Sequence, residues 1–198
     1  MNFYKSTAKQ PFQTTIMKTT IKTILSTFII LMVLGCGKAI AQTDILVVID
    51  QDYAKRNEVL SQLPSGAAVI NLKSNSNPWK DIREKLTSDK DLKQIHLFVE
   101  SGFNSLLMAG IEYNAEKVQS EFELSMLEGI YTGIHYQLYL YTCNLPSNPE
   151  GLELIKELGN KTYFNIAAST NCQEGADHDF NFDYTTLDQP IAGSIFKI

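Results

Sequence analysis

Cys143 is placed in the chain where a catalytic nucleophile could stand. It follows an apolar, tyrosine-rich run, residues 137–142, and precedes a short loop and a helix start at Asn148. A cysteine between the carboxyl end of a buried strand and a helix N-terminus occupies the position where open α/β folds carry their chemistry. The strand that should supply a histidine partner ends instead in Glu-Ser-Gly, residues 100–102. The expected base is therefore missing from the place where it should be.

The three histidines differ in their chance of replacing that base. His96 belongs to an apolar strand pattern, so we interpret it as a packed, hydrogen-bonded residue. His135 precedes the run that leads to Cys143, and a strand of about seven residues spans more than about 20 Å, beyond hydrogen-bond reach. His178 follows the next predicted strand, on the same edge as Cys143. It is the one histidine that could fold back as a base.

Three interpretations of Cys143 remain open. The leading one is a small buried residue at a strand end, the remnant of an earlier site. The second is a disulfide with Cys172, which an oxidising compartment would permit and which requires Cα atoms within about 7 Å. The third is a working nucleophile, which requires a lowered thiol pKa.

The elements that must position these residues alternate between strands and helices. Apolar runs predict strands at residues 45–49, 67–72, 95–99, 137–142 and 163–168, a short extended piece at 106–111 and a final strand at 193–198. Helices are predicted at 54–63, 78–86, 114–127 and 148–158, with Pro64 and Gly159 as stops. This order predicts an α/β fold with a mainly parallel sheet of about five to six strands and helices on both faces.

In such a sheet, the carboxyl ends of the third, fourth and fifth strands lie along one edge. Besides Cys143, Ser101 and His178, this edge should carry polar groups that could contact a ligand. These candidate binding residues are Glu100, Gly102, Asn144, Ser169 and Thr170.

An acidic segment near the C-terminus has the spacing of a calcium loop. The oxygen ligands would be Asp177, Asp179, Asn181, Asp183 and Asp188. However, Phe182 stands where such a loop needs glycine, and the closing residue is not glutamate. Alternation explains the segment more simply, with Phe180, Phe182 and Tyr184 facing inward and the acids facing water. We therefore expect no metal site, and no cofactor.

The first 41 residues read as a secretory signal. Lys18 and Lys22 precede an uncharged run, residues 24–34, and Ala41 closes an Ala-x-Ala cleavage site. The natural start of this signal would be Met17. The apolar run is shorter than the roughly 20 residues that span a bilayer. We expect a secreted or periplasmic protein; in the alternative, Cys36 ends a lipobox-like sequence and anchors an outer-membrane lipoprotein.

Removal of the signal makes the remaining chain strongly acidic. Five of the 17 basic residues and none of the 22 acidic ones lie in residues 1–41, so 12 basic and 22 acidic residues remain, a formal net charge of −10. That charge disfavours nucleic acid and anionic membranes as partners. Residues 42–198 are long enough for a single domain with one core. A protein or a peptide is the expected partner.

Four motifs together resemble a known family. They are residues 95–102 (Ile-His-Leu-Phe-Val-Glu-Ser-Gly), 106–110 (Leu-Leu-Met-Ala-Gly), 138–144 (Leu-Tyr-Leu-Tyr-Thr-Cys-Asn) and 166–170 (Ile-Ala-Ala-Ser-Thr). They are similar to the successive motifs of the domain of unknown function 4347, and the resemblance extends from Asp44 to about Asp183. It implies a caspase-like and gingipain-like three-layer α/β sandwich. In relatives with peptidase activity, a histidine before the motif glycine and the cysteine after strand four form a catalytic dyad.

The resemblance transfers unevenly to this sequence. Cys143 and Asn144 match the family motif, whereas Ser101 stands where the resemblance places the histidine. A register shifted by one residue would put Glu100 there instead. A serine can neither hold a proton near neutral pH nor stabilise a thiolate by charge. We therefore expect a degenerate, non-catalytic peptidase-like domain that binds a partner in the former active-site cleft; the alternative is a cysteine peptidase that uses Cys143 with His178 or Glu100 as base.

Overall fold

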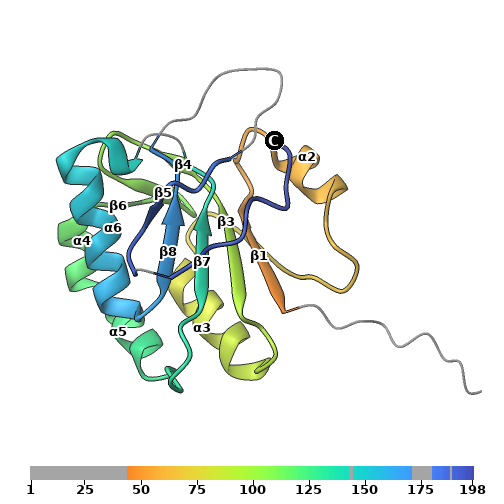
Figure 1. Ribbon diagram of the computed structural model, residues 1–198, viewed down its shortest axis with the longest axis horizontal. Coiled ribbons are helices and arrows are strands. Elements are labelled where there is room, and N and C mark those ends of the chain that lie inside the picture. The colour runs from red at the N-terminus through yellow and green to blue at the C-terminus, as the bar shows by residue number, and fades with distance from the viewer. Residues whose placement is uncertain (1–43, 143–144, 171–179, 188) are drawn as a thin grey trace, which may run out of the picture. The chain divides into compact units, whose positions relative to one another are not determined.

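The computed structural model describes residues 44–142, 145–170, 180–187 and 189–198, all of which belong to one compact unit, residues 41–198 (Figure 1). The predicted signal segment, with Met17, Cys36 and the cleavage site at Ala41, lies outside the described residues. Among the helices that the structure does describe, none is long and apolar enough to cross a membrane.

The main sheet has six strands within the described residues, in the spatial order β2-β1-β3-β7-β8-β9. All neighbours are parallel except β9, which is antiparallel to β8. The predicted α/β fold with a mainly parallel sheet is therefore confirmed. The strands are β1 (Ile45–Asp50), β2 (Ala68–Leu72), β3 (Gln94–Phe98), β7 (Gln137–Leu140), β8 (Asn165–Ala168) and β9 (Tyr184–Thr185).

Four helices pack against one face of this sheet, called here the helical face. They are α3 (Pro78–Ser88), α4 (Ala115–Ser120), α5 (Phe122–Glu128) and α6 (Pro149–Thr162). Alternate strand residues such as Leu46 and Leu97 are fully buried against helix residues such as Trp79 and Leu158. Each such aliphatic side chain contributes about 1.5–3 kcal/mol by leaving water. This face is a continuous, mainly aliphatic core.

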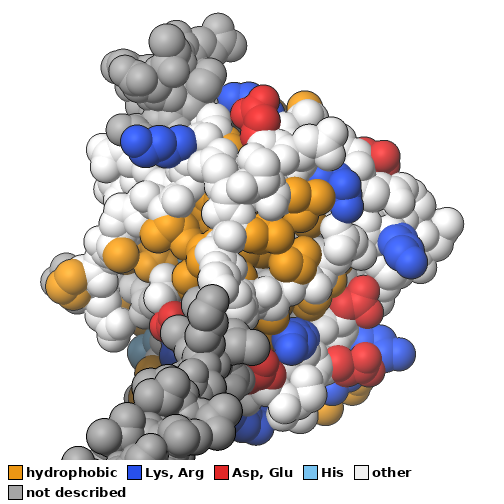
Figure 2. Space-filling view, turned by 90° about the vertical axis from the view of Figure 1, so that its right-hand side faces the viewer, with side chains coloured by type: hydrophobic (Ala, Val, Ile, Leu, Met, Phe, Trp, Pro, Cys, Tyr) orange, Lys and Arg blue, Asp and Glu red, His pale blue; other side chains and the backbone are white. Residues whose placement is uncertain are grey.

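The opposite face, called here the aromatic face, is covered differently. It packs against the short helix α2 (Arg56–Ser61) and against residues 180–182 and 189–198, which are neither helix nor strand. Its buried side chains include Phe98, Tyr139 and Tyr141 from the sheet and Phe196 from the end of the chain. Figure 2 looks at the side on which α2 and β1 lie, and it shows hydrophobic side chains gathered at the middle of that side. Helices thus lie on both faces, but very unequally.

The predicted extended piece at 106–111 is instead a hairpin in a second, small sheet. Its antiparallel strands are β4 (Glu100–Ser101), β5 (Leu106–Met108) and β6 (Ile111–Tyr113). The chain reverses at Ala109 and Gly110, which have φ values of 55° and 77°. Two successive positive φ values are typical of a tight hairpin turn. An alanine at the first position gives little sequence signal for such a turn.

The helix predicted at 114–127 is divided at Glu121, whose ψ of 113° is extended. The Glu121 carboxylate accepts a hydrogen bond from the Glu123 backbone N–H at 3.4 Å, so it caps α5. It also accepts one from Asn77 Nδ2 at 3.3 Å. No glycine or proline marks this break. The contact with Asn77, 44 residues away, stabilises it.

The prediction that Gly159 ends a helix is wrong, because α6 continues to Thr162. A Cβ on Gly159 would lie 3.2 Å from Thr186 Cγ2, so this glycine allows the helix to approach the β9 segment closely. The helix ends instead with Tyr163 in the left-handed conformation, at φ 56°. The predicted start of α2 at residue 54 is also early, since the helix begins at Arg56.

The predicted final strand at 193–198 is also wrong, because these residues form no strand. Residues 189–198, called here the C-terminal strap, are held instead by side chains. Phe196 and Ile198 are buried on the aromatic face. The Gln62 side chain donates to the Lys197 carbonyl oxygen and accepts from the Lys197 N–H, both at 2.8 Å. Gln62 therefore takes the place that a neighbouring strand would have.

Candidate functional site

The predicted site edge exists in the structure. Strands β3, β7 and β8 are parallel neighbours, and their carboxyl ends point to the same end of the molecule (Figure 1). Thr142 and Ser169, which follow β7 and β8, are buried there, and Thr170 is half-buried. Cys143, Asn144, Cys172 and His178 lie outside the described residues. The nucleophile and disulfide interpretations therefore stay predictions.

The Glu-Ser-Gly segment continues from β3 into the small sheet at this edge. Ser101 is half-buried, whereas Glu100 and Gly102 are exposed. One Glu100 oxygen accepts a hydrogen bond from the Ala54 N–H at 3.1 Å. A Cβ on Gly102 would lie 2.7 Å from Ser105 Oγ, so only glycine fits there without a shift. The segment is thus tied to the β1–α2 loop and, through a hydrogen bond from the Gly102 N–H to the Ser105 carbonyl oxygen at 2.9 Å, to the turn before β5.

Tyr53 lies beside Glu100 in the β1–α2 loop. Burial, followed by the negative charge of Glu100, raises the pKa of Tyr53 to about 12. The phenol is therefore neutral over the whole physiological range. It can donate a hydrogen bond here but cannot serve as a base.

Asp50, which follows the strand predicted at residues 45–49, organises the same edge. This carboxylate is buried; Oδ2 accepts from the Ala109 N–H at 2.6 Å and Oδ1 accepts from the Asp52 N–H at 3.0 Å. The first bond holds the left-handed Ala109 at the hairpin turn. An acidic residue directly after five apolar strand residues was the available signal, since a buried carboxylate requires specific partners.

The loop that precedes α6 is tightly packed. It contains a single 3₁₀ turn, Leu145–Ser147. Asn148 caps the helix by accepting from the Gly151 N–H at 2.7 Å, and its Nδ2 donates to the Phe103 carbonyl oxygen at 2.8 Å. A Cβ on Gly151 would lie 2.0 Å from the Leu145 carbonyl oxygen, so the approach of loop and helix requires glycine. Asn148 thus connects the helix start to the β4–β5 turn.

Thr170 is clamped by Asp183 across the end of β8. The Thr170 N–H donates to Asp183 Oδ1 at 2.7 Å, and its hydroxyl donates to Oδ2. Burial alone would raise the pKa of Asp183, but the hydrogen bonds from Thr170 outweigh it and lower that pKa. Both carboxylate oxygens are engaged within the protein. This disfavours Asp183 as a calcium ligand.

The alternation predicted for this acidic segment is confirmed over its described part. Phe180, Phe182 and Tyr184 are partly buried, whereas Asn181 and Asp183 are exposed. Asp177, Asp179 and Asp188 of the calcium-loop pattern lie outside the described residues. Over the described ranges, no group of three or more acidic, cysteine or histidine side chains is arranged to hold a metal ion.

His96 is the packed residue that its sequence context predicted. It is 1% exposed, its ring stacks on Tyr139 at 4.6 Å, and its Nδ1 lies 3.0 Å from the Tyr141 hydroxyl. Its Nε2 has no hydrogen-bond partner among the described residues. Burial lowers the pKa of His96 to about 4, against a weaker opposing effect of Asp44. The imidazole is neutral and enclosed, and it does not reach the carboxyl edge.

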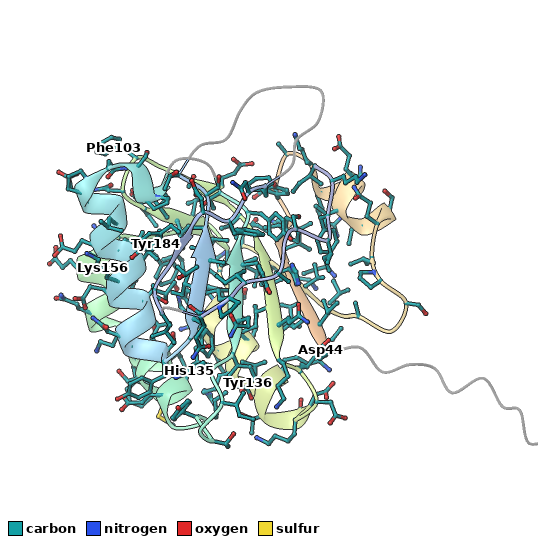
Figure 3. The ribbon with its side chains drawn as sticks, in the orientation of Figure 1. Asp44, Phe103, His135, Tyr136, Lys156 and Tyr184 are labelled. Atoms are coloured by element: carbon teal, nitrogen blue, oxygen red, sulfur yellow. The ribbon has the colours of Figure 1, made fainter. Side chains whose placement is uncertain are left out.

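His135 lies at the other end of the sheet, as predicted. Figure 3 labels it near the start of β7, opposite Phe103, which lies at the carboxyl edge. Its Nδ1 lies 2.6 Å from the Tyr163 carbonyl oxygen, and its ring packs on Tyr131 at 4.9 Å. In the part of the chain that the structure describes, the carboxyl edge thus carries carboxylates and hydroxyls but no imidazole.

Comparison with known proteins gave a match to one family model. Searches of curated proteins and of solved structures found no match to the chain. A family model, the domain of unknown function DUF4347, matches residues 46–192, which extend from β1 into the C-terminal strap. The chain therefore belongs to the DUF4347 family.

Proposed function

We propose that this protein is an extracytoplasmic, non-catalytic domain with a peptidase-like fold, and that it binds a protein or peptide at the carboxyl edge of its main sheet. The α/β fold and the family match support this proposal, and so does Ser101, at the position where the resemblance implies a catalytic base. In this proposal the edge keeps the capacity to recognise a partner and has lost the capacity to cleave one.

The observation that carries the proposal is the environment of residues 100–102. Ser101 stands at the position that the resemblance assigns to the dyad histidine, and it is built into β4 opposite Leu106. His96 and His135 are held elsewhere by their own hydrogen bonds. Loss of one member of a catalytic dyad removes most of the rate enhancement, by analogy with triads in which single members were removed.

Export is part of the same proposal. The signal pattern in residues 1–41 supports secretion or a periplasmic location, with cleavage after Ala41, and lipidation at Cys36 is the alternative. N-terminal sequencing of the protein recovered from its native host tests both. A mature N-terminus at Gln42 supports cleavage, whereas a blocked N-terminus at Cys36 supports the lipid anchor.

Alkylation of Cys143 tests the loss of catalysis. In a Cys172→Ser variant, the rate of reaction with iodoacetamide is measured against pH. We expect a midpoint at or above the free-thiol value of about 8.5, the behaviour of a thiol that no neighbouring cation activates. The Cys143→Ala variant should retain its stability and its partner binding.

A midpoint well below that value would instead support the peptidase alternative, with His178 or Glu100 as base. Glu100 stays a candidate base in this alternative, because its side chain is exposed and one of its oxygens accepts a hydrogen bond from a backbone N–H. Thiol titration with Ellman's reagent in the denatured, unreduced protein decides the third interpretation. Two reactive thiols in the mature chain would exclude the bridge between Cys143 and Cys172.

A further inference from the structure

The small sheet beside the carboxyl edge has a solvent face with an unusual row of side chains. Glu100 of β4 is paired with Leu107 of β5, and Leu107 is paired with Glu112 of β6. Residues paired across antiparallel strands point to the same side of a sheet. All three side chains are exposed, and Leu107 is 44% exposed. An apolar side chain thus lies between two carboxylates in one transverse row.

The two glutamates are held in place but keep their charge uncompensated. Glu112 accepts a hydrogen bond from Ser105 Oγ at 2.6 Å, and Glu100 accepts one from the Ala54 N–H. The ion pairs within the described residues involve four acidic side chains: Glu84, Glu123, Asp89 and Glu121. Glu100 and Glu112 are not among them. The row therefore presents two oriented negative charges and no internal cation.

Phe103 extends this surface at the turn between β4 and β5 of the same small sheet. It is 71% exposed, and its backbone is fixed because Asn148 Nδ2 donates to its carbonyl oxygen. Figure 3 shows Phe103 at the outer end of the molecule, on the side where β7 and β8 end. Phe103 in the β4–β5 turn and Leu107 in β5 thus leave two apolar side chains of this part of the molecule exposed to water, where a partner could cover them.

We propose that this face, formed by Glu100, Leu107 and Glu112 with Phe103 at its rim, binds an arginine or lysine side chain of a protein or peptide segment. The aliphatic stem of that residue would cover Leu107, and its cationic head would lie between the two carboxylates. Phe103 would contact an apolar residue of the partner, next to the bound arginine or lysine. The inference rests on the proposed binding function and names the chemistry of its partner.

Charge and spacing select this occupant over a metal ion or an anion. The row offers only two glutamates, two strand spacings or about 10 Å apart at the backbone, whereas calcium takes about six to eight oxygen ligands. Within the described residues, no group of three or more acidic, cysteine or histidine side chains is placed to hold a metal ion. The acidic charge of residues 42–198 repels anionic ligands. A guanidinium or ammonium group on a long stem fits both constraints.

Fluorescence anisotropy of labelled peptides tests the proposal. The protein is expressed as the full chain and then purified. The probes are a fluorescein-labelled peptide, Ala-Ala-Leu-Arg-Leu-Ala-Ala, and the same peptide with neutral citrulline in place of arginine. We expect the arginine peptide to bind about 3- to 10-fold more tightly in low salt, as expected for exposed ion pairs. This preference should shrink as salt screens the charges.

Variants locate the effect. Glu100→Gln combined with Glu112→Gln keeps both hydrogen-bond acceptors and should remove the preference for arginine. The matched control, Glu84→Gln with Glu116→Gln, removes the same charge from exposed positions on α3 and α4 and should retain it. Equal affinity for the two peptides, binding of neither, or an equal loss in the control would each overturn the inference.

The proposed function can fail separately. If the arginine peptide were bound with the predicted preference but cleaved, and Cys143 were alkylated rapidly, the site would be a peptidase specificity site. If Cys143 were unreactive and the two peptides bound equally, the non-catalytic function would stand and this partner chemistry would be wrong.

Discussion

The two faces of the main sheet are built from alternate residues of the same strands, yet they are covered in different ways. On the helical face, side chains such as Val48 and Leu97 pack against four helices. On the aromatic face, Tyr139, Tyr141 and Phe98 pack against one short helix and irregular chain. Aromatic rings contact one another repeatedly there, for example Phe98 with Tyr141 at 4.1 Å.

The faces also differ in how their covering chain is held. Helices satisfy their own backbone groups, so the helical face needs only apolar contact. The C-terminal strap forms neither helix nor strand. It depends on a series of side-chain hydrogen bonds that runs from His96 through Tyr141 to Ser194. The Ser194 hydroxyl lies 2.6 Å from the Phe196 carbonyl oxygen and accepts from the Phe196 N–H. We infer that the helical face supplies most of the free energy of unfolding, and that the aromatic face makes this free energy depend on pH.

The largest expected effect is on the helical face. Trp79→Ala removes a fully buried ring that packs edge-on against Tyr113 at 6.0 Å, and it should lower the free energy of unfolding by about 3–5 kcal/mol. Urea denaturation measures this. Phe122→Ala is the control, because Phe122 is a 69% exposed aromatic residue on the same face's helices. If both variants lost the same stability, the central role of Trp79 in the core of the helical face would be incorrect.

The aromatic face should make stability depend on pH. His96 has a pKa of about 4 when folded, below its ordinary 6.5, so the unfolded chain takes up a proton first as the pH falls. This contribution is complete above pH 6.5 and is lost as the pH falls towards 4, by about 3 kcal/mol in total.

Unfolding of the wild type and of His96→Gln at several pH values isolates the contribution of His96 to the free energy of unfolding. The difference in their unfolding free energies should shrink by about that amount between pH 7 and pH 4. A difference that stays constant with pH would show that His96 is protonated equally in both states.

A smaller effect is expected at Ser194. Ser194→Ala leaves the buried Tyr141 hydroxyl with one polar neighbour fewer and should cost about 1–2 kcal/mol. Amide exchange followed by NMR should also accelerate at Phe196, whose N–H loses its acceptor. Ser120→Ala, on an exposed helix position, should change neither quantity. Unchanged exchange at Phe196 would contradict the anchoring role of Ser194.

The smallest effect should come from Gln62. Gln62→Ala removes two hydrogen bonds to Lys197 at the surface, with an expected loss of about 0.5–1 kcal/mol. The loss should be local, so the Lys197 amide exchanges faster while amides of α6 are unaffected. A global loss of protection would mean that the strap and the helices unfold as one unit.

Prediction from the sequence succeeded where local pattern and tertiary role coincide. The apolar runs around Val48, Leu97 and Ile166 became parallel strands, because only burial on both faces accommodates them. His96 was correctly predicted to be packed, since it stands in such a run. Prediction failed at Glu121 and Gly159, where a distant partner decided the local geometry.

For the candidate site, sequence alone determined which groups reach the carboxyl edge. The order and length of the strands bring Ser101, Ser169 and Thr170 there. The sequence also has serine at position 101, where the family resemblance implies a histidine. Only the tertiary structure decided how these groups are held. Asp50 fixes a left-handed alanine 59 residues away, and Asp183 clamps Thr170.

The overall division follows from the range of the forces. Hydrophobic alternation and helix caps act within a few residues, so the sequence by itself determined the strands, the helices and the mainly parallel sheet. Side-chain hydrogen bonds between distant segments have no local pattern. For this reason only the tertiary structure decided the hairpin at Ala109, the hold on the C-terminal strap and the row of Glu100, Leu107 and Glu112.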